Sequence, residues 1–207
     1  RPRATATGDL LFSRAFALLA GHDEMRAVEL LASTSVALAR GELSQRQDAY
    51  DTSISEQRYL ERCQLKTGRL FECACLLGCD DPELGRFGAE IGLAFQLLDD
   101  VLDVSGPPER TGKARGTDLL DGTVTLPLIL ARDRDPGIAA VDLHGLDAAS
   151  AESLCDRIAS SGVLDLVRAR ALETVAGAKR RLGNASLEAE RRHLLELVAD
   201  GVVERYA

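Results

Sequence analysis

The sequence predicts an all-α fold, and three observations support this. Nearly every segment repeats apolar residues at helical spacing, whereas the alternating patterns typical of strands are almost absent. Stretches rich in glycine and proline separate these runs. Of the 207 residues, 45% are hydrophobic and 28% are charged, which is enough for a real core beneath a polar surface. We therefore expect one helical domain over residues 1–207.

The expected helices follow from apolar runs and from the breakers between them. Gly21 ends the first run, "CDDPEL" separates the third from the fourth, and "SGPPERTGKARG" interrupts the chain after Asp103. The last three runs are amphipathic and joined by short connections, as in antiparallel bundles. The runs cover residues 8–21, 24–42 and 55–78, then a fourth run that contains 92–106, and finally 151–162, 163–183 and 186–207.

Composition excludes several classes of protein. A net charge of −8 argues against a general nucleic-acid binder, because such proteins carry excess lysine and arginine. No stretch is long and apolar enough to span a bilayer, and the first residues lack the apolar core of a signal peptide. The five cysteines lack paired C-x-x-C spacing, so we expect reduced thiols and no zinc site. The sequence thus predicts a cytoplasmic protein.

Three aspartates end an otherwise apolar helical run, "GLAFQLLDDVLDVSG". Asp99 and Asp103 are four residues apart, Asp100 and Asp103 are three apart, and Gln96 lies one turn earlier. We expect these four polar groups to converge on one edge of the helix. Clustered carboxylates repel one another, whereas Mg²⁺ takes carboxylate oxygens and leaves positions open for phosphate. The pattern predicts a divalent-metal site.

The alternative to a metal site is a solvated acidic turn at the end of the helix. Negative charge is unfavourable at a helix C-terminus, and the preceding residues are too apolar for an exposed helix, so we favour the metal. A second aspartate pair, Asp80 and Asp81, has a different explanation. Asp81 directly precedes Pro82, which suits the first helical position, and we expect this pair to cap a helix.

Two further segments carry polar residues of interest. "GKARGTDLLDGTVTLPLIL" places Lys113 in a glycine-rich connection ahead of an apolar run, where a basic loop could close over a polyanion such as diphosphate. Lys66 and Thr67 interrupt a mostly helical segment. Each residue taken alone is expected to be an ordinary surface residue.

Together these segments resemble the trans-polyprenyl, or isoprenyl, diphosphate synthases. The resemblance runs from Gly8 to the C-terminus, is strongest between Gly41 and Leu130, and includes the family's second aspartate-rich motif in "FQLLDDVLD". It implies a helical bundle around a central cavity, with metal and diphosphates at the mouth. The segments that carry it are "GELSQ", "YLERCQLKTGRLFECACLLG", "FQLLDDVLD" and "GKARGTDLLDGTVTLPL".

The resemblance also implies a reaction and a role for each matching residue. The three aspartates of the motif would bind Mg²⁺ that bridges to an allylic diphosphate, and Lys66 and Lys113 would contact that diphosphate. Thr67 and Gln96 would lie near the allylic carbon, where their dipoles stabilise a developing cation. Isopentenyl diphosphate would attack the cation, and loss of a proton would give a longer polyprenyl diphosphate. The family also implies a homodimer that pairs through the helix containing "LLFSRAFALLA".

Two departures from the family pattern affect the functional prediction. Thr123 in "DGTVTLP" stands where many relatives have lysine. The first aspartate-rich motif and the motif that binds isopentenyl diphosphate normally precede Gly8, so we expect an N-terminally incomplete domain. Three functions compete: a prenyltransferase, a non-catalytic or degraded homologue that assists a partner, and a terpene synthase. We favour the first, because the site residues are retained together and no terpene-synthase second metal motif is evident.

The first eight residues give a geometric prediction. "RP" at the start resembles the end of the family's arginine-rich motif, and "ATGDLLFSRAF" resembles the helix that follows it. In relatives about a dozen residues lie between these pieces, whereas here only "RAT" does. We therefore expect a break in the chain between Arg3 and Thr7, with an adjacent Cα pair far beyond the ~3.8 Å of a trans peptide.

Overall fold

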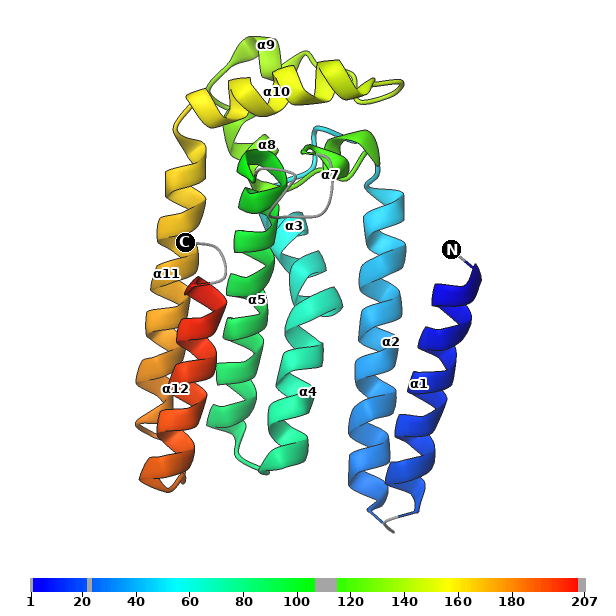
Figure 1. Ribbon diagram of the computed structural model, residues 1–207, viewed down its shortest axis with the longest axis vertical. Helices are drawn as coiled ribbons and strands as arrows, with labels where there is room; N and C mark the ends of the chain where they lie inside the picture. The colour runs from blue at the N-terminus through cyan, green and yellow to red at the C-terminus, as the bar shows by residue number, and fades with distance from the viewer. Residues whose placement is uncertain (1, 22–23, 107–114, 205–207) are drawn as a thin grey trace.

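The computed structural model describes residues 2–21, 24–106 and 115–204, and this part of the chain is helical with no strand, as predicted (Figure 1). The elements are α1 (Pro2–Ala20), α2 (Met25–Gln47), α3 (Glu56–Cys63), the π-helical η1 (Gln64–Gly68), α4 (Arg69–Gly78), α5 (Pro82–Ser105), α7 (Thr117–Leu120), α8 (Leu126–Arg132), α9 (Pro136–Ala139), α10 (Ala148–Ser160), α11 (Val163–Leu182) and α12 (Ala189–Glu204).

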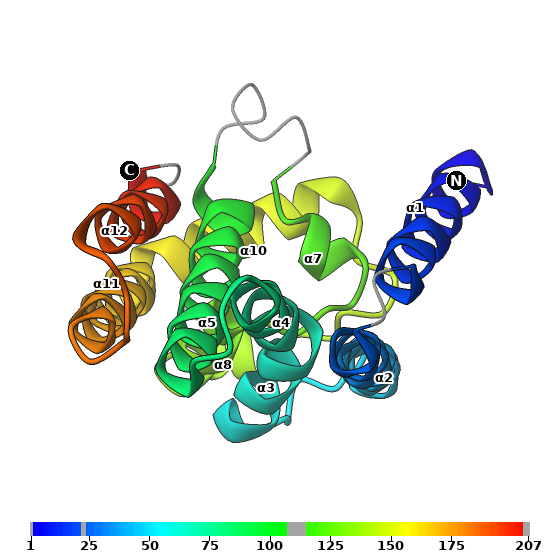
Figure 2. The same ribbon diagram turned by 90° about the horizontal axis from the view of Figure 1, so that it is seen from below.

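The long helices lie side by side, and α9 and α10 cross one end of the bundle (Figure 1). In the view from below, α5 lies between α11 and α4, while α1 and α12 occupy opposite margins (Figure 2). The most extensive helix contacts are those of α5 with α11 and with α4. Helix α5 is therefore the central element of the core, and its C-terminal end lies near α7 and α8.

Helix α5 forms because its start is capped and one face is apolar. The Asp81 side chain accepts a hydrogen bond from the Glu83 backbone N–H at 2.9 Å, and Pro82 occupies the first turn. This confirms the cap predicted for Asp81. Phe87 and Ile91, four residues apart, are almost fully buried, and each such side chain stabilises the fold by roughly 1.5–3 kcal/mol.

Helix α1 begins earlier than predicted and is continuous. It runs from Pro2 to Ala20, so the expected break between Arg3 and Thr7 is wrong. The Thr7 hydroxyl donates to the Arg3 carbonyl at 2.9 Å within the same helix. The early residues gave no apolar period, but alanine favours helix, and this extends the element toward its N-terminus.

The run predicted over 55–78 is helical, but its backbone hydrogen bonds change from α-helical to π-helical spacing at η1. Gly41 of α2 allows a close approach there, because a Cβ atom at this position would lie only 2.8 Å from the Lys66 backbone nitrogen. The backbone of α2 thus packs directly against η1. Single π turns inside helices are frequent at functional sites, and this one carries Lys66 and Thr67.

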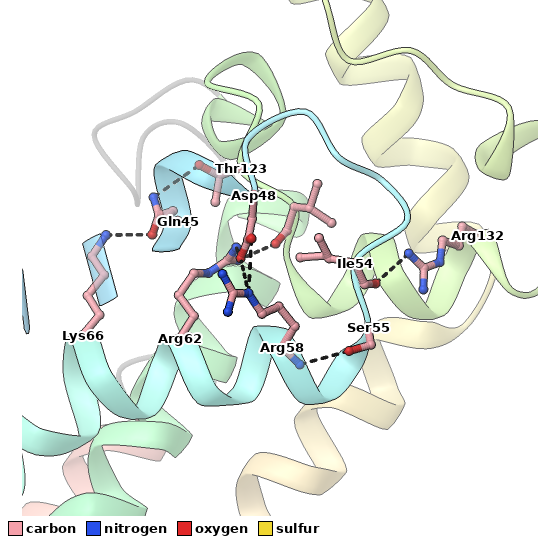
Figure 3. A network of polar contacts seen from close by, with 10 residues as sticks. Gln45, Asp48, Ile54, Ser55, Arg58, Arg62, Lys66, Thr123 and Arg132 are labelled. Atoms are coloured by element: carbon pink, nitrogen blue, oxygen red, sulfur yellow. Dashed lines mark hydrogen bonds and ion pairs between the residues drawn. The ribbon is translucent and has the colours of Figure 1, made fainter. Parts of the chain in front are cut away.

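Two loops meet at the end of the bundle. Tyr50 has a positive φ of 65°, and its N–H donates to the Gly122 carbonyl at 2.8 Å. The Tyr50 ring stacks on His144 with a centroid distance of 4.2 Å. Arg132 of α8 donates to the carbonyl of Ile54 at 2.8 Å, which fixes the chain just before α3 (Figure 3). The Tyr50–Gly122 hydrogen bond holds the loop after α2 against the loop after α7, and the other two contacts join the loop after α2 to His144 and to α8.

All five cysteines are free, as expected from their spacing. None of the helices in the described ranges is long and apolar enough to cross a membrane.

Candidate functional site

A pocket of about 290 Å³ lies where α2, α3 and η1, the end of α5 and the loop after α7 come together, and we call it the Asp99 pocket. It contains four of the predicted site residues. A larger hollow of about 570 Å³ beside α10 contains none of them. The Asp99 pocket is lined by Gln45, Tyr59, Arg62, Cys63, Lys66, Gln96, Asp99, Asp100, Asp118, Thr123 and Thr125.

A chain of hydrogen bonds runs along one side of the Asp99 pocket. The Thr67 hydroxyl donates to Gln96 Oε1 at 3.1 Å, and Gln96 Nε2 donates to Asp100 Oδ1 at 2.8 Å. The Tyr59 hydroxyl donates to Asp100 Oδ2 at 2.6 Å. The predicted residues Thr67 and Gln96 are therefore in contact, and both carboxylate oxygens of Asp100 accept hydrogen bonds.

Asp100 is 1% exposed, and its environment shifts its protonation. Burial raises the pKa of Asp100 to about 7, although the hydrogen bonds from Tyr59 and Gln96 act in the opposite direction. Burial also raises the pKa of Cys63 to about 12 and that of Tyr59 well above its usual range. The thiol and the phenol therefore stay protonated at neutral pH.

The buried carboxyl of Asp100 is expected to make stability depend on pH. Between about pH 4 and pH 7 the unfolded chain releases a proton that the folded protein keeps, so stability is present at low pH and lost as the pH rises through 7. We expect Asp100→Asn to raise the free energy of unfolding by roughly 1–3 kcal/mol at pH 8, with little change near pH 4. Urea denaturation in EDTA at both pH values measures this.

A matched control for this prediction is Asp9→Asn, because Asp9 is exposed on α1. It is expected to change stability by less than about 0.5 kcal/mol at either pH. An Asp100→Asn variant that is equally stabilised or destabilised at pH 4 and pH 8 would contradict the burial argument.

The three aspartates of the motif differ in burial and in hydrogen bonding. Gln96 and Asp100 join the inner hydrogen-bond chain, whereas Asp99 is exposed and Asp103 half-buried. Successive residues of a helix point about 100° apart, so Gln96, Asp99, Asp100 and Asp103 fall within one arc of about 100°, and the first three line the same pocket. Among the described residues, no three His, Cys, Asp or Glu side chains are placed to hold a metal ion together. Three of the four polar groups therefore share one pocket, as expected, whereas a metal site made by all three aspartates stays a prediction.

The donor set nevertheless suits Mg²⁺ bound partly by substrate. Mg²⁺ is usually held by one or two carboxylates, with waters and substrate phosphates as the other ligands. Asp99 lines the pocket, and Asp103, one turn later, accepts a hydrogen bond from the Asp118 backbone N–H at 3.2 Å. These two carboxylates supply oxygen ligands of the required kind. The metal role predicted for Asp100 stays a prediction.

Lys66 is half-buried and belongs to a polar contact network that reaches the loop after α7 (Figure 3). Its Nζ donates to Gln45 Oε1 at 2.9 Å and pairs with Glu42 at 3.1 Å. The hydrogen bond from Lys66 lowers the pKa of Glu42. Gln45 Nε2 in turn donates to the Thr123 hydroxyl at 3.4 Å. Lys113, the other predicted lysine, lies outside the described residues.

Sequence reasoning missed two buried charged residues at this site. Arg62 lines the Asp99 pocket, is 3% exposed, and donates from Nη2 to the Val124 carbonyl at 2.5 Å. Its guanidinium pairs with buried Asp48 at 3.6 Å, and Asp48 also accepts from Arg58 Nε at 3.1 Å. The available signal was that Arg62 and Lys66 are four residues apart and share a helix face.

Comparison with known proteins identifies the family. Residues 1–154 match the family model described as polyprenyl synthetase. The chain is 34% identical to geranylfarnesyl diphosphate synthase of Natronomonas pharaonis, covering 98% of this chain and 63% of the relative. It is 38% identical to heptaprenyl diphosphate synthase component 2 of Geobacillus stearothermophilus, covering 72% of this chain and 49% of the relative. The chain thus spans about half to two thirds of these relatives.

A solved structure agrees with this match. The structure of polyprenyl synthase from Caulobacter crescentus, complexed with calcium and isoprenyl diphosphate, superposes with a TM-score of 0.91 at 35% identity. It matches 100% of this chain and 67% of that chain. The helical fold, the family model and these relatives agree, and the chain belongs to the polyprenyl synthetase family.

Proposed function

We propose that this protein is a prenyltransferase that condenses an allylic diphosphate with isopentenyl diphosphate to give a longer polyprenyl diphosphate. The observation that carries the proposal is that Lys66, Gln96 and Asp99 line one pocket, with Thr67 bonded to Gln96. The names of the relatives support the same reaction class, and the Caulobacter structure contains a divalent cation with an isoprenyl diphosphate.

In this proposal Asp99 and Asp103 hold Mg²⁺. When bound, the ion neutralises charge on the diphosphate and so improves it as a leaving group. The two carboxylates act as electrostatic anchors and form no covalent bond. Asp100 orients Gln96 through their 2.8 Å hydrogen bond.

Lys66 and the Thr67–Gln96 pair act on the allylic diphosphate. Lys66 places a positive charge beside the departing diphosphate. The allylic carbon–oxygen bond breaks with its electron pair on the diphosphate, and the double bond of isopentenyl diphosphate forms the new carbon–carbon bond. Oxygens of Thr67 and Gln96 stabilise the intervening cation by their dipoles. Loss of one proton restores an alkene.

The test is an assay of full-length protein with radiolabelled isopentenyl diphosphate, Mg²⁺ and a set of allylic diphosphate primers. We expect extended products, resolved by chain length, and no product in EDTA. Failure to extend any primer in Mg²⁺ would contradict the proposal. Product that appears only after a second synthase chain is added would favour the alternative of an assisting subunit, for which the Geobacillus relative, named as component 2, is a precedent.

We further propose that the protein is a homodimer that pairs through α1. This helix exposes four large apolar side chains, more than a solvated helix normally carries, and a second copy would cover them. They are Leu10, Leu11, Phe12 and Leu18, which are 60%, 63%, 44% and 66% exposed. Light scattering of full-length protein at micromolar concentration is expected to give twice the monomer mass, and a monomer would contradict the proposal. The cytoplasmic location stays a prediction.

A further inference from the structure

We propose that Arg62 is a diphosphate-binding residue of the Asp99 pocket. This inference rests on the proposed function, because the ligand that we assign to Arg62 is the diphosphate group of a substrate of that reaction. Arg62 lines the pocket between Tyr59 and Lys66, one helical turn from each. Three observations support the assignment. The guanidinium of Arg62 is buried, its Nη1 has no hydrogen-bond partner among the described residues, and its paired carboxylate is shared with a second arginine.

The guanidinium of Arg62 is buried and incompletely bonded. Nη2 donates to the Val124 carbonyl at 2.5 Å, whereas Nη1 has no hydrogen-bond partner in the described structure. Its ion pair with Asp48 is 3.6 Å long, beyond hydrogen-bond distance. A buried donor left without an acceptor is destabilising, and more so when the donor is charged. An anion in the adjoining pocket would supply the missing acceptor.

Arg62 shares its paired carboxylate with a second arginine. Asp48 is a single carboxylate, and it is shared by Arg58 and Arg62 (Figure 3). These three residues place two guanidinium groups against one carboxylate, while Asp99, Asp100 and Asp118 also line the pocket. Arg58 is 43% exposed at its side chain and is not among the lining residues, whereas Arg62 is buried against the pocket. Of the two guanidinium groups, that of Arg62 is therefore the one that borders the pocket.

Lys66 is more fully hydrogen-bonded than Arg62. Its ammonium group lies 3.1 Å from the Glu42 carboxylate and 2.9 Å from Gln45 Oε1. Two of its three donors thus already have acceptors. Thr123, on the opposite loop, lines the pocket with an uncharged hydroxyl. Each described cation that lines the pocket shares its carboxylate with an arginine, since Glu42 also pairs with Arg46 at 3.6 Å, but only Arg62 has a buried nitrogen, Nη1, without an acceptor.

The competing explanation is that Arg62 only ties α3 to the 121–125 loop through Val124. The experiment must therefore measure anion binding and must include a charge restored from another position. We propose isothermal titration of full-length protein with inorganic diphosphate in Mg²⁺, beside steady-state kinetics with an allylic diphosphate. Arg62→Met is expected to weaken diphosphate binding and raise the allylic KM by at least about tenfold, because a charge-assisted contact is lost.

Two variants separate charge from structure. Adding Thr123→Lys to Arg62→Met places an ammonium group on the loop that lines the same pocket, and we expect most of the lost diphosphate affinity to return. Arg62→Met combined with Asp48→Asn removes both buried charges, so it keeps the proposal testable if the single variant folds poorly. The matched control is Arg58→Met, which breaks the other Asp48 ion pair and is expected to leave diphosphate affinity within about twofold.

The outcomes distinguish this inference from the proposed function. Normal diphosphate affinity in folded Arg62→Met would overturn the inference even if wild-type protein makes polyprenyl products. Loss of affinity that Thr123→Lys does not restore, but that Arg58→Met reproduces, would also overturn it, because it would show a structural role for the Asp48 group. Binding that depends on Arg62 in a protein without turnover would support the inference and contradict the proposed function.

Discussion

Replacing Asp99 with alanine is expected to lower turnover of the full-length protein by roughly 10²–10³-fold while leaving the fold intact. Asp99 lies at the surface of the Asp99 pocket, so its removal creates no cavity in the core. The variant loses a carboxylate that we propose holds Mg²⁺ beside the diphosphate. Steady-state kinetics over a range of Mg²⁺ concentrations measures the effect, with circular dichroism as the check on folding.

The chain offers a matched control for this prediction. Asp80 is also the first of two adjacent aspartates, is exposed, and forms an ion pair with Arg26. It lies just after the C-terminal end of α4, whereas the pocket residue Lys66 lies before the start of that helix. Asp80→Ala is expected to retain turnover within about twofold. The stabilisation of wild-type protein by diphosphate and Mg²⁺ in thermal melts is expected to disappear in Asp99→Ala and to persist in Asp80→Ala. Near-normal turnover of a folded Asp99→Ala variant would contradict the proposal that Asp99 holds Mg²⁺.

Helix type and order were predictable because an apolar stripe at helical spacing is a local property of the sequence. The buried series through Phe87 and Ile91 and the cap at Asp81 are both visible in the residues themselves. The start of α1 was not predictable, since the residues before Gly8 have no apolar period to mark a helix. The π turn at η1 depends on how closely α2 approaches through Gly41, which is a tertiary contact.

The sequence predicted which residues form the site better than it predicted how those residues are buried and bonded. Asp99 and Asp100 are neighbours in sequence with the same side chain, yet one is exposed and the other is 1% exposed. Helical spacing places Asp100 beside the apolar stripe and Asp99 away from it, but the complete burial of Asp100 depends on Tyr59 of α3, a tertiary contact that the sequence pattern does not show. Arg62 was missed for a related reason. A charged residue in an amphipathic helix suggests a solvated face, whereas here Asp48, directly after α2, pairs with Arg62 and allows it to be buried.

The second large effect is expected at Gly122, which joins the two loops beside the pocket. Its φ of +70° lies in the left-handed region, where a residue with a Cβ atom costs about 1–2 kcal/mol. A Cβ atom there would also lie 2.4–2.6 Å from three atoms of the Tyr50 ring. Tyr50 cannot easily move away, because its N–H bonds the Gly122 carbonyl and its ring stacks on His144.

We therefore expect Gly122→Ala to lower the free energy of unfolding by about 3 kcal/mol or more, which corresponds to a fall in Tm of roughly 6–12 °C. Gly162→Ala is the matched control, because Gly162 has a similar φ of +74° and open space around its Cβ position, so it reports backbone strain alone. In a Tyr50→Ala background the clash is absent, and Gly122→Ala should then cost only as much as Gly162→Ala. Equal costs for the two glycine variants in the wild-type background would show that the Tyr50 ring yields freely and does not constrain this loop.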